Sequence, residues 1–287
     1  PNIYETNKKM NNRAARRTSP GVMKPKKSLG QHFLKTKGPV EIMLQAAKEE
    51  PAVDVVLEIG PGGGILTRAL VKAFPMVMAI EKDERLAGAL KRKLENENII
   101  NCEIIAGDIL KVNAANIAQK KTYAVIANIP YYLTSRLIRI FLETKHQPLY
   151  MILMVQKEVA ERIVARVPHM NLLALSVQAY GRPEILMGIS KTAFTPQPKV
   201  NSAILKISDI SKQFFEKHDA SESRFFLLLR AGFSQKRKYL SNSLERHFGS
   251  KKAAEEKIKK AGLAPTARPQ ELSLENWVSL LQQTRLS

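Results

Sequence analysis

The residues best suited to chemistry in this chain lie in one segment, Ala124 to Ser135, with the sequence A-V-I-A-N-I-P-Y-Y-L-T-S. Its apolar start predicts a buried strand, which must end near Asn128 because Pro130 cannot donate to a strand ladder. Ligands of an open parallel sheet bind at the carboxyl ends of its strands. There, the Asn128 oxygen and the Pro130 carbonyl could accept both hydrogens of an exocyclic amine, while Tyr131 stacks on the ring. An ordinary strand-to-helix turn with Asn128 as a cap explains the segment equally well by itself.

A glycine-rich segment, D-V-V-L-E-I-G-P-G-G-G from Asp54 to Gly64, adds a cofactor site. It has the order strand, glycine turn, helix, which lets a ligand approach the backbone closely. The nicotinamide fingerprint G-x-G-x-x-G would need glycine where the chain has Ile65. The pattern E-x-G-x-G, which includes Gly60 and Gly62, is instead typical of contact with the methionine part of S-adenosylmethionine. We therefore predict that cofactor.

Two acidic residues follow the next predicted strands. The strand from Met76 to Ile80 is followed by Glu81, about 20 residues after the glycine turn, where an acid accepts hydrogen bonds from a ribose diol. The strand from Asn101 to Ile105 precedes Asp108, whose carboxylate could accept from the cofactor's adenine amine. With the Asn128 strand, the ordered set predicts one nucleoside site at one sheet edge.

The second half of the sheet is predicted from the strands Leu149 to Val155 and Glu184 to Ile189, and from a last strand that ends at Ile207 and runs antiparallel. The loop before this last strand is stiffened by two prolines and carries Phe194, which could close the far face of the base that Tyr131 covers. A core aromatic that anchors the loop is the alternative.

The chain divides into three parts. Residues 1–26 form a basic flexible arm, for which a solvated tail, an RNA-binding role and a transit peptide all stay open. Residues 27–209 form an α/β domain with a doubly wound, Rossmann-like methyltransferase sheet, mostly parallel with an antiparallel last strand. Residues 210–287 form a small all-α domain, and its basic residues predict RNA binding, above all Lys236, Arg237 and Lys238.

Composition supports a polyanionic partner. The chain has 46 Lys and Arg against 26 Asp and Glu, a formal net charge of +20. No apolar run approaches the roughly 18 residues of a membrane span. The single cysteine, Cys102, excludes an intramolecular disulfide, and the five histidines lack ligand spacing, so we predict no metal. We expect an intracellular, cytoplasmic monomer that does not associate with membranes.

Taken together, six motifs resemble those of the ribosomal RNA adenine N6,N6-dimethyltransferases, over about residues 26 to 285. They are K-S-L-G-Q-H-F-L, E-I-G-P-G-G-G, Asp108, N-I-P-Y, F-T-P-Q-P-K-V-N-S-A and G-F-S-Q-K-R-K-Y-L-S-N-S-L. The last favours the bacterial small-subunit type over the large-subunit macrolide-resistance type and mitochondrial transcription factors of the same fold. The resemblance implies cofactor contacts at His32, Leu34, Gly60, Glu81, Asp108 and Asn128. His32 departs from the family, where Asn is usual.

The resemblance also implies a reaction: S-adenosylmethionine-dependent dimethylation of two adjacent adenosines in the 3′-terminal hairpin loop of small-subunit ribosomal RNA, on an immature subunit. Two alternatives stay open. One is a large-subunit adenine methyltransferase, and the other is a non-catalytic RNA-binding assembly or transcription factor of the same fold.

Overall fold

The computed structural model describes residues 25–26, 30–111, 121–235 and 237–284. Most of the predicted basic arm and Lys236 lie outside these ranges. Within them, no helix has the length and apolar character needed to cross a membrane. In the same ranges, no group of three or more His, Cys, Asp or Glu side chains could hold a metal ion.

A seven-stranded mixed sheet has the order β4-β3-β2-β5-β6-β9-β7. Its strands are β2 (Val55–Ile59), β3 (Val77–Glu81), β4 (Cys102–Ala106), β5 (Tyr123–Asn128), β6 (Met151–Gln156), β7 (Arg182–Ile189) and β9 (Ser202–Ser208). The pairs from β4 to β6 are parallel, and β9 is antiparallel to both β6 and β7. The predicted fold class, with its antiparallel last strand, is confirmed.

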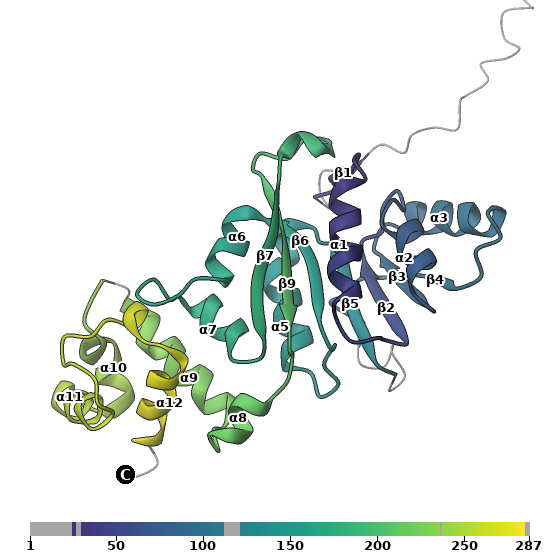
Figure 1. The fold of residues 1–287 in the computed structure, drawn as a ribbon. Coiled ribbons are helices and arrows are strands. Elements are labelled where there is room, and N and C mark those ends of the chain that lie inside the picture. The colour runs from purple at the N-terminus through teal and green to yellow at the C-terminus, as the bar shows by residue number, and fades with distance from the viewer. Residues whose placement is uncertain (1–24, 27–29, 112–120, 236, 285–287) are drawn as a thin grey trace, which may run out of the picture.

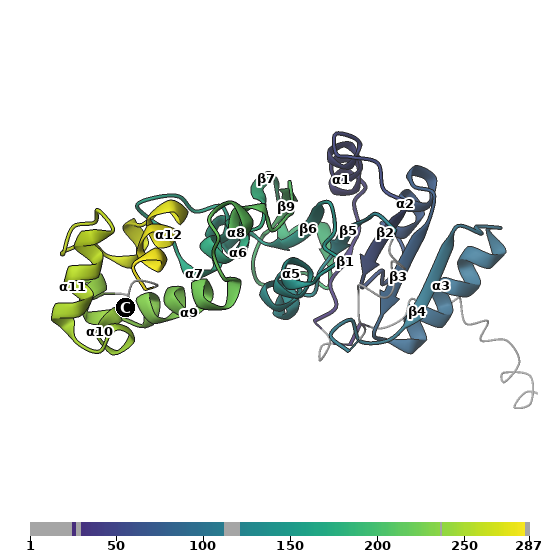
Figure 2. The same ribbon diagram turned by 90° about the horizontal axis from the view of Figure 1, so that it is seen from below.

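Helices cover both faces of this sheet and continue into a helical end. Before β9 they are α1 (Gly38–Lys48), α2 (Thr67–Ala73), α3 (Glu84–Asn96), α5 (Thr134–Glu143), α6 (Lys157–Ile163) and α7 (Leu172–Gln178). After β9 they are α8 (Gln213–Lys217), α9 (Glu222–Gly232), α10 (Leu240–Phe248), α11 (Lys251–Lys260) and α12 (Leu274–Gln282). Figure 2 shows α1 and α2 on one side of the sheet and α5 on the other.

The alternation of side chains along the central strands creates the two layers of the core. In β5, Tyr123, Val125 and Ala127 join the hydrophobic cluster that includes α5 and α7. Ala124 and Ile126 face the opposite way, into the cluster with α1 and α2. Successive strand residues point to opposite faces, so a strand covered on both sides is apolar throughout. This is why the run before Asn128 reads as continuously hydrophobic.

A two-stranded sheet outside the main one was not predicted. β1 (Phe33–Leu34) pairs antiparallel with β8 (Phe194–Thr195), about 160 residues further along the chain. The N–H of Lys35 extends the pairing by donating to the Ala193 carbonyl at 2.8 Å. The pairing fixes the segment before α1 to the loop before β9, both at the carboxyl edge of β5 and β6.

The helical end shares its core with the sheet. One hydrophobic cluster runs from β5 and β6 through α7 to α9, α10 and α12. At the junction, Tyr180 packs against Phe215 and Phe226, with ring centroids 5.2 and 5.9 Å away. Trp277 of α12 is fully buried, as predicted for an anchor. Figures 1 and 2 show α9 to α12 at the opposite end of an elongated molecule from β4 and α3. The boundary near residue 210 stays a prediction.

Candidate active site

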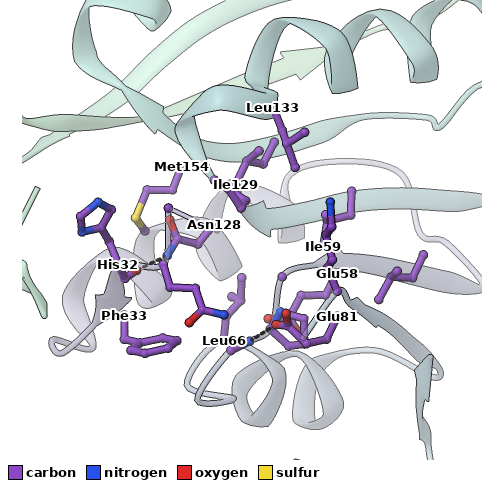
Figure 3. Close-up of a pocket in the computed structure, with 18 of the residues that line it drawn as sticks. His32, Phe33, Glu58, Ile59, Leu66, Glu81, Asn128, Ile129, Leu133 and Met154 are labelled. Carbon is purple, nitrogen blue, oxygen red and sulfur yellow. Dashed lines mark hydrogen bonds between the residues drawn. The ribbon is translucent and has the colours of Figure 1, made fainter. Parts of the chain in front are cut away.

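A cavity of about 210 Å³ lies at the carboxyl ends of β2, β3, β4 and β5. The predicted site residues that line it are His32, Leu34, Gly60, Gly62, Glu81, Asp108, Asn128, Pro130 and Tyr131. Figure 3 shows Glu58 and Glu81 at one end of the cavity, and Asn128 with His32 at the other. Residues that are distant in sequence therefore meet where the parallel strands end, as the sheet topology requires.

The glycine turn after β2 shapes the floor of the cavity. Gly60 and Gly62 have φ angles of +69° and +54°, which residues other than glycine adopt only with backbone strain. A Cβ on Gly62 would also lie 2.9 Å from the ring of Phe33. The second glycine is thus required both for its backbone conformation and for the close approach of the N-terminal segment.

Glu81 ends β3 with its carboxylate buried in the cavity wall. Its Oε2 accepts the Gly62 N–H at 3.1 Å, and its Oε1 accepts the Asp83 N–H at 2.9 Å. Burial raises the pKa of Glu81, and these two backbone donors oppose the rise. Each carboxylate oxygen has a second lone pair, so the group can also accept from a diol.

Glu58, the acid of the E-x-G-x-G pattern, also lines the cavity, although no separate role was predicted for it. It is only 1% exposed, and its Oε2 has no hydrogen-bond partner within the described residues. Burial raises the pKa of Glu58 to about 8; the neighbouring Thr67 hydroxyl opposes the rise, and the charge of Glu81 on the adjacent strand adds to it. The signal was the acid in an otherwise apolar strand, V-V-L-E-I. At neutral pH the Glu58 carboxyl group is therefore protonated in the folded protein.

Asp108 closes the cavity beyond β4. Its Oδ2 forms a 2.8 Å ion pair with Lys82, and its Oδ1 accepts the Leu110 N–H at 3.0 Å. The Lys82 hydrogen bond is the main cause that lowers the pKa of Asp108, so the group is a carboxylate at neutral pH. Lys82, a cavity residue that the sequence patterns did not indicate, is about half exposed.

The N-terminal segment is tied to both ends of the cavity. At one end, Gln31 and Lys26 contact the carboxylate of Asp83 at 3.4 and 3.3 Å. Asp83 is buried and caps α3, and its hydrogen bonds with Arg85 hold its pKa below the usual range. At the other end, the His32 carbonyl accepts from Asn128. The segment thus lies along the cavity from β3 to β5.

The side chain of His32 lies on the Tyr131 side of the cavity. Its ring stacks on Tyr131 with centroids 5.7 Å apart, and its Nδ1 lies 2.7 Å from the Pro196 carbonyl. Because a carbonyl only accepts, Nδ1 is the donor of this bond. In this conformation the imidazole therefore belongs to the aromatic side of the site, and its expected contact with the cofactor stays a prediction.

Asn128 is the last residue of β5, and a hydrogen bond from its Nδ2 fixes the orientation of its amide. Its Nδ2 donates to the His32 carbonyl at 3.4 Å, so the side-chain oxygen is left as a free acceptor within the described residues. The next residues form a 3-10 turn, Tyr131–Leu133, in which the Leu133 N–H donates to the Pro130 carbonyl at 2.9 Å. This bond uses one lone pair of the Pro130 carbonyl, which was predicted as the second acceptor for the amine.

Tyr131 is held from two sides. Its hydroxyl lies 2.7 Å from the hydroxyl of Ser202, a fully buried residue of β9, and His32 covers one face of its ring. The ring is half-buried at the cavity wall, with its orientation fixed, as stacking on a base requires. Ser202 belongs to the F-T-P-Q-P-K-V-N-S-A motif, but no role was predicted for it.

Phe194, which was predicted to close the far face of the base, is buried in this structure, and its role toward the base stays a prediction. The ring is 1% exposed, does not line the cavity and packs in the cluster with α1. Pairing of β8 with β1 turns this side chain inward, so no face of the ring is open to a base in this structure. The alternative, a core aromatic that anchors the loop, fits what is observed.

The predicted basic run is remote from this cavity. Arg237 and Lys238 are exposed between α9 and α10, in the helical end of the molecule, and neither lines the cavity. Lys236 lies outside the described residues. An RNA-binding role of these residues stays a prediction.

Comparison with known proteins assigns the chain to a family. The ribosomal RNA adenine dimethylase family matches residues 22–285. The chain belongs to this family. It is 42% identical to the ribosomal RNA small subunit methyltransferase A of Dehalococcoides mccartyi, over 90% of this chain and 88% of that protein.

Solved structures agree with this assignment. A dimethyladenosine transferase from Plasmodium falciparum matches with a TM-score of 0.77 and 26% identity, over 89% of this chain and 98% of that one. The 23S rRNA methyltransferase ErmE shares the fold, with a TM-score of 0.66 and 24% identity, over 88% and 98%. The predicted resemblance to the rRNA adenine dimethylases is confirmed.

As a ribosomal RNA adenine dimethylase, the chain is an S-adenosylmethionine-dependent methyltransferase, and the predicted enzyme class and cofactor are confirmed. The cavity residues fit that cofactor. The turn at Gly60 and Gly62 admits a close ligand, and Glu81 offers buried acceptor sites in the wall of the cavity.

Proposed function

We propose that this chain dimethylates the N6 amines of two adjacent adenosines in the hairpin loop near the 3′ end of small-subunit ribosomal RNA. Asn128 and Tyr131 carry the proposal, because an amide whose oxygen has no partner among the described residues stands beside an oriented aromatic ring at the edge of the cofactor cavity. The choice of RNA rests on the similarity to a protein named for the small subunit. The substrate would be an immature small subunit in the cytoplasm, and the enzyme would act as a monomer.

The residues of the cavity suit an amine that is a poor nucleophile. The N6 lone pair of adenine is delocalised into the ring, and it becomes available when both N–H groups are held by acceptors that favour a pyramidal nitrogen. The Asn128 oxygen would accept one hydrogen. The Pro130 carbonyl would accept the other through its second lone pair, because the bond from the Leu133 N–H uses only one. Asn128 then orients the amine rather than acting as a base.

When bound, S-adenosylmethionine supplies an electrophilic methyl group on its sulfonium. Glu81 would accept from the ribose hydroxyls and Asp108 from the cofactor's adenine amine, while Gly60, Gly62 and Leu34 would form the wall of the site. Deprotonation needs no strong base, because the methylated nitrogen is acidic once it carries a positive charge.

The target base must leave its stack to reach Asn128, which favours a hairpin loop over a duplex. Tyr131 would receive the base on the face that His32 does not cover. For the second transfer, the monomethylated amine must bind again with its one remaining hydrogen. Its methyl group then occupies the place beside one of the two acceptors that a hydrogen held before.

The experiment is to incubate labelled S-adenosylmethionine with undermethylated small and large ribosomal subunits and to map the modified base. Fully methylated small subunits are the matched control. We expect label in two adjacent adenosines of the small-subunit hairpin loop. Label in the large subunit would replace this function with the large-subunit activity, and no label in either would favour a non-catalytic assembly factor.

A further inference from the structure

An aromatic side chain stands exposed in the helical end of the molecule, far from the cavity. Tyr239 is 45% exposed, whereas Phe225 and Trp277 in the same helical end are fully buried. It directly follows Arg237 and Lys238, in a region, residues 224–260, that holds eleven Lys or Arg and three acids. A large ring left in water beside a basic run is the composition of a surface that stacks nucleic-acid bases.

An arginine accompanies the ring. The guanidinium carbon of Arg268 lies 5.9 Å from the centroid of Tyr239, within the range of a cation–π contact. Arg268 is exposed, and no carboxylate within the described ranges forms an ion pair with it. Its positive charge is therefore available to a polyanion.

The two side chains are carried by backbone segments that are bonded to each other. The N–H of Leu240 donates to the Ala267 carbonyl at 2.8 Å, which joins the residues after Tyr239 and before Arg268. The Arg268 N–H is capped by the carboxylate of Glu271 at 2.9 Å, so the acid on this turn is used to fix the backbone. The ring and the guanidinium are thus presented by an ordered frame, which limits the entropy lost on binding.

The flanking charges complete the surface. Arg237 and Lys238 are both exposed, and neither forms an ion pair with any residue that the structure describes. We propose that Tyr239 and Arg268 form a stacking platform for an unpaired RNA base whose neighbouring phosphates lie on Arg237 and Lys238. The proposal rests on the proposed function only in taking RNA as the partner, and it adds a second base contact, remote from the target adenine.

The test compares two RNAs on the full-length protein. One is a stem–loop with an unpaired adenosine-rich loop, and the other has the same backbone with abasic sugars in the loop. Tyr239→Ala should weaken binding of the first RNA by about 5- to 150-fold, the range expected for one lost base stack. It should leave binding of the abasic RNA unchanged. Tyr239→Phe should bind both RNAs as the wild type does, because it keeps the ring.

Two further variants separate the platform from general effects. Leu227→Ala, which truncates another exposed side chain of the helical end, is the matched control and should bind as the wild type does. Arg268→Lys keeps the charge but loses the planar group, so it should weaken binding of the base-containing RNA more than that of the abasic one.

Equal losses of affinity for the two RNAs in Tyr239→Ala, or no loss at all, would overturn the platform. Methylation of ribosomal subunits by the wild-type protein is measured separately. If the wild type methylates but Tyr239→Ala binds both RNAs normally, the platform fails alone. If the wild type does not methylate while Tyr239→Ala loses affinity for the base-containing RNA alone, the proposed function fails and the platform stands.

Discussion

Replacing the buried acid Glu58 by Gln should remove a pH dependence of stability. The wild-type carboxyl group has a folded pKa of about 8 because it is buried beside Glu81, against an ordinary value of 4.5. Since the folded pKa is the higher one, the folded state keeps its proton while the unfolded state loses it. The stabilisation from this group is therefore complete below pH 4.5 and is lost as the pH rises to about 8.

The size of the effect follows from the difference of about 3.5 pKa units between the values 4.5 and 8. At about 1.36 kcal/mol per unit, the wild type should lose at most roughly 5 kcal/mol of unfolding free energy across this window. Glu58→Gln carries no titrating group there. Relative to the wild type, it should therefore gain stability as the pH rises to 8, and the difference should stay constant above that.

The assay is urea unfolding of both proteins at a series of pH values from 4 to 9. Glu95→Gln, at an exposed position on α3, is the matched control and should run parallel to the wild type. Parallel curves for Glu58→Gln and the wild type would refute the burial of a neutral acid in the cavity.

Three further changes probe the cofactor site, the basic run and the helical core. Glu81→Ala should weaken S-adenosylmethionine binding by about 1 to 3 kcal/mol in calorimetry because buried acceptor sites are lost; unchanged affinity, or tighter binding of a nicotinamide dinucleotide, would contradict the assigned site. Replacing the basic residues of the run Lys236–Lys238 by Gln should reduce the salt dependence of RNA binding by roughly 0.7 to 0.9 log units per lost phosphate contact, without changing cofactor affinity; a wild-type slope would leave the run as a solvated face. Gly232→Ala should lower the free energy of unfolding by about 1 to 3 kcal/mol, since a Cβ there collides with Trp277; unchanged stability in urea would show that the ring can move aside.

Local patterns predicted the strands and the residues that end them, and the reason is physical. The apolar run before Asn128 and the glycine turn after β2 are set by neighbours in the sequence, and parallel strands bring their carboxyl ends to one edge. Glu81 and Asp108 could be assigned to the cavity for the same reason. The bounds of the strands differ from the predicted ones by one or two residues, which local patterns do not fix.

What local patterns did not predict depends on distant contacts. β1 and β8 are two residues each, too short to show any periodicity, and their pairing decides that Phe194 is buried. The stacking of His32 on Tyr131 depends on the same pairing, because it brings the Pro196 carbonyl to the imidazole. The raised pKa of Glu58 depends on the burial of β2 and on the charge of Glu81 on the neighbouring strand β3.

The most direct test of the central claim is the methyl-transfer rate of Asn128→Ala, measured in single turnovers at saturating cofactor and RNA. Tyr131→Ala is the companion variant and should weaken RNA binding as well, by roughly 1 to 3 kcal/mol of lost stacking. Asn128→Ala removes the free amide oxygen but leaves the Tyr131 ring and the basic surface in place. We expect its transfer rate to fall about 100- to 1000-fold with little change in RNA affinity, as for other preorganised polar partners of a reacting group. Transfer at the wild-type rate would contradict the mechanism and leave N-I-P-Y as a turn.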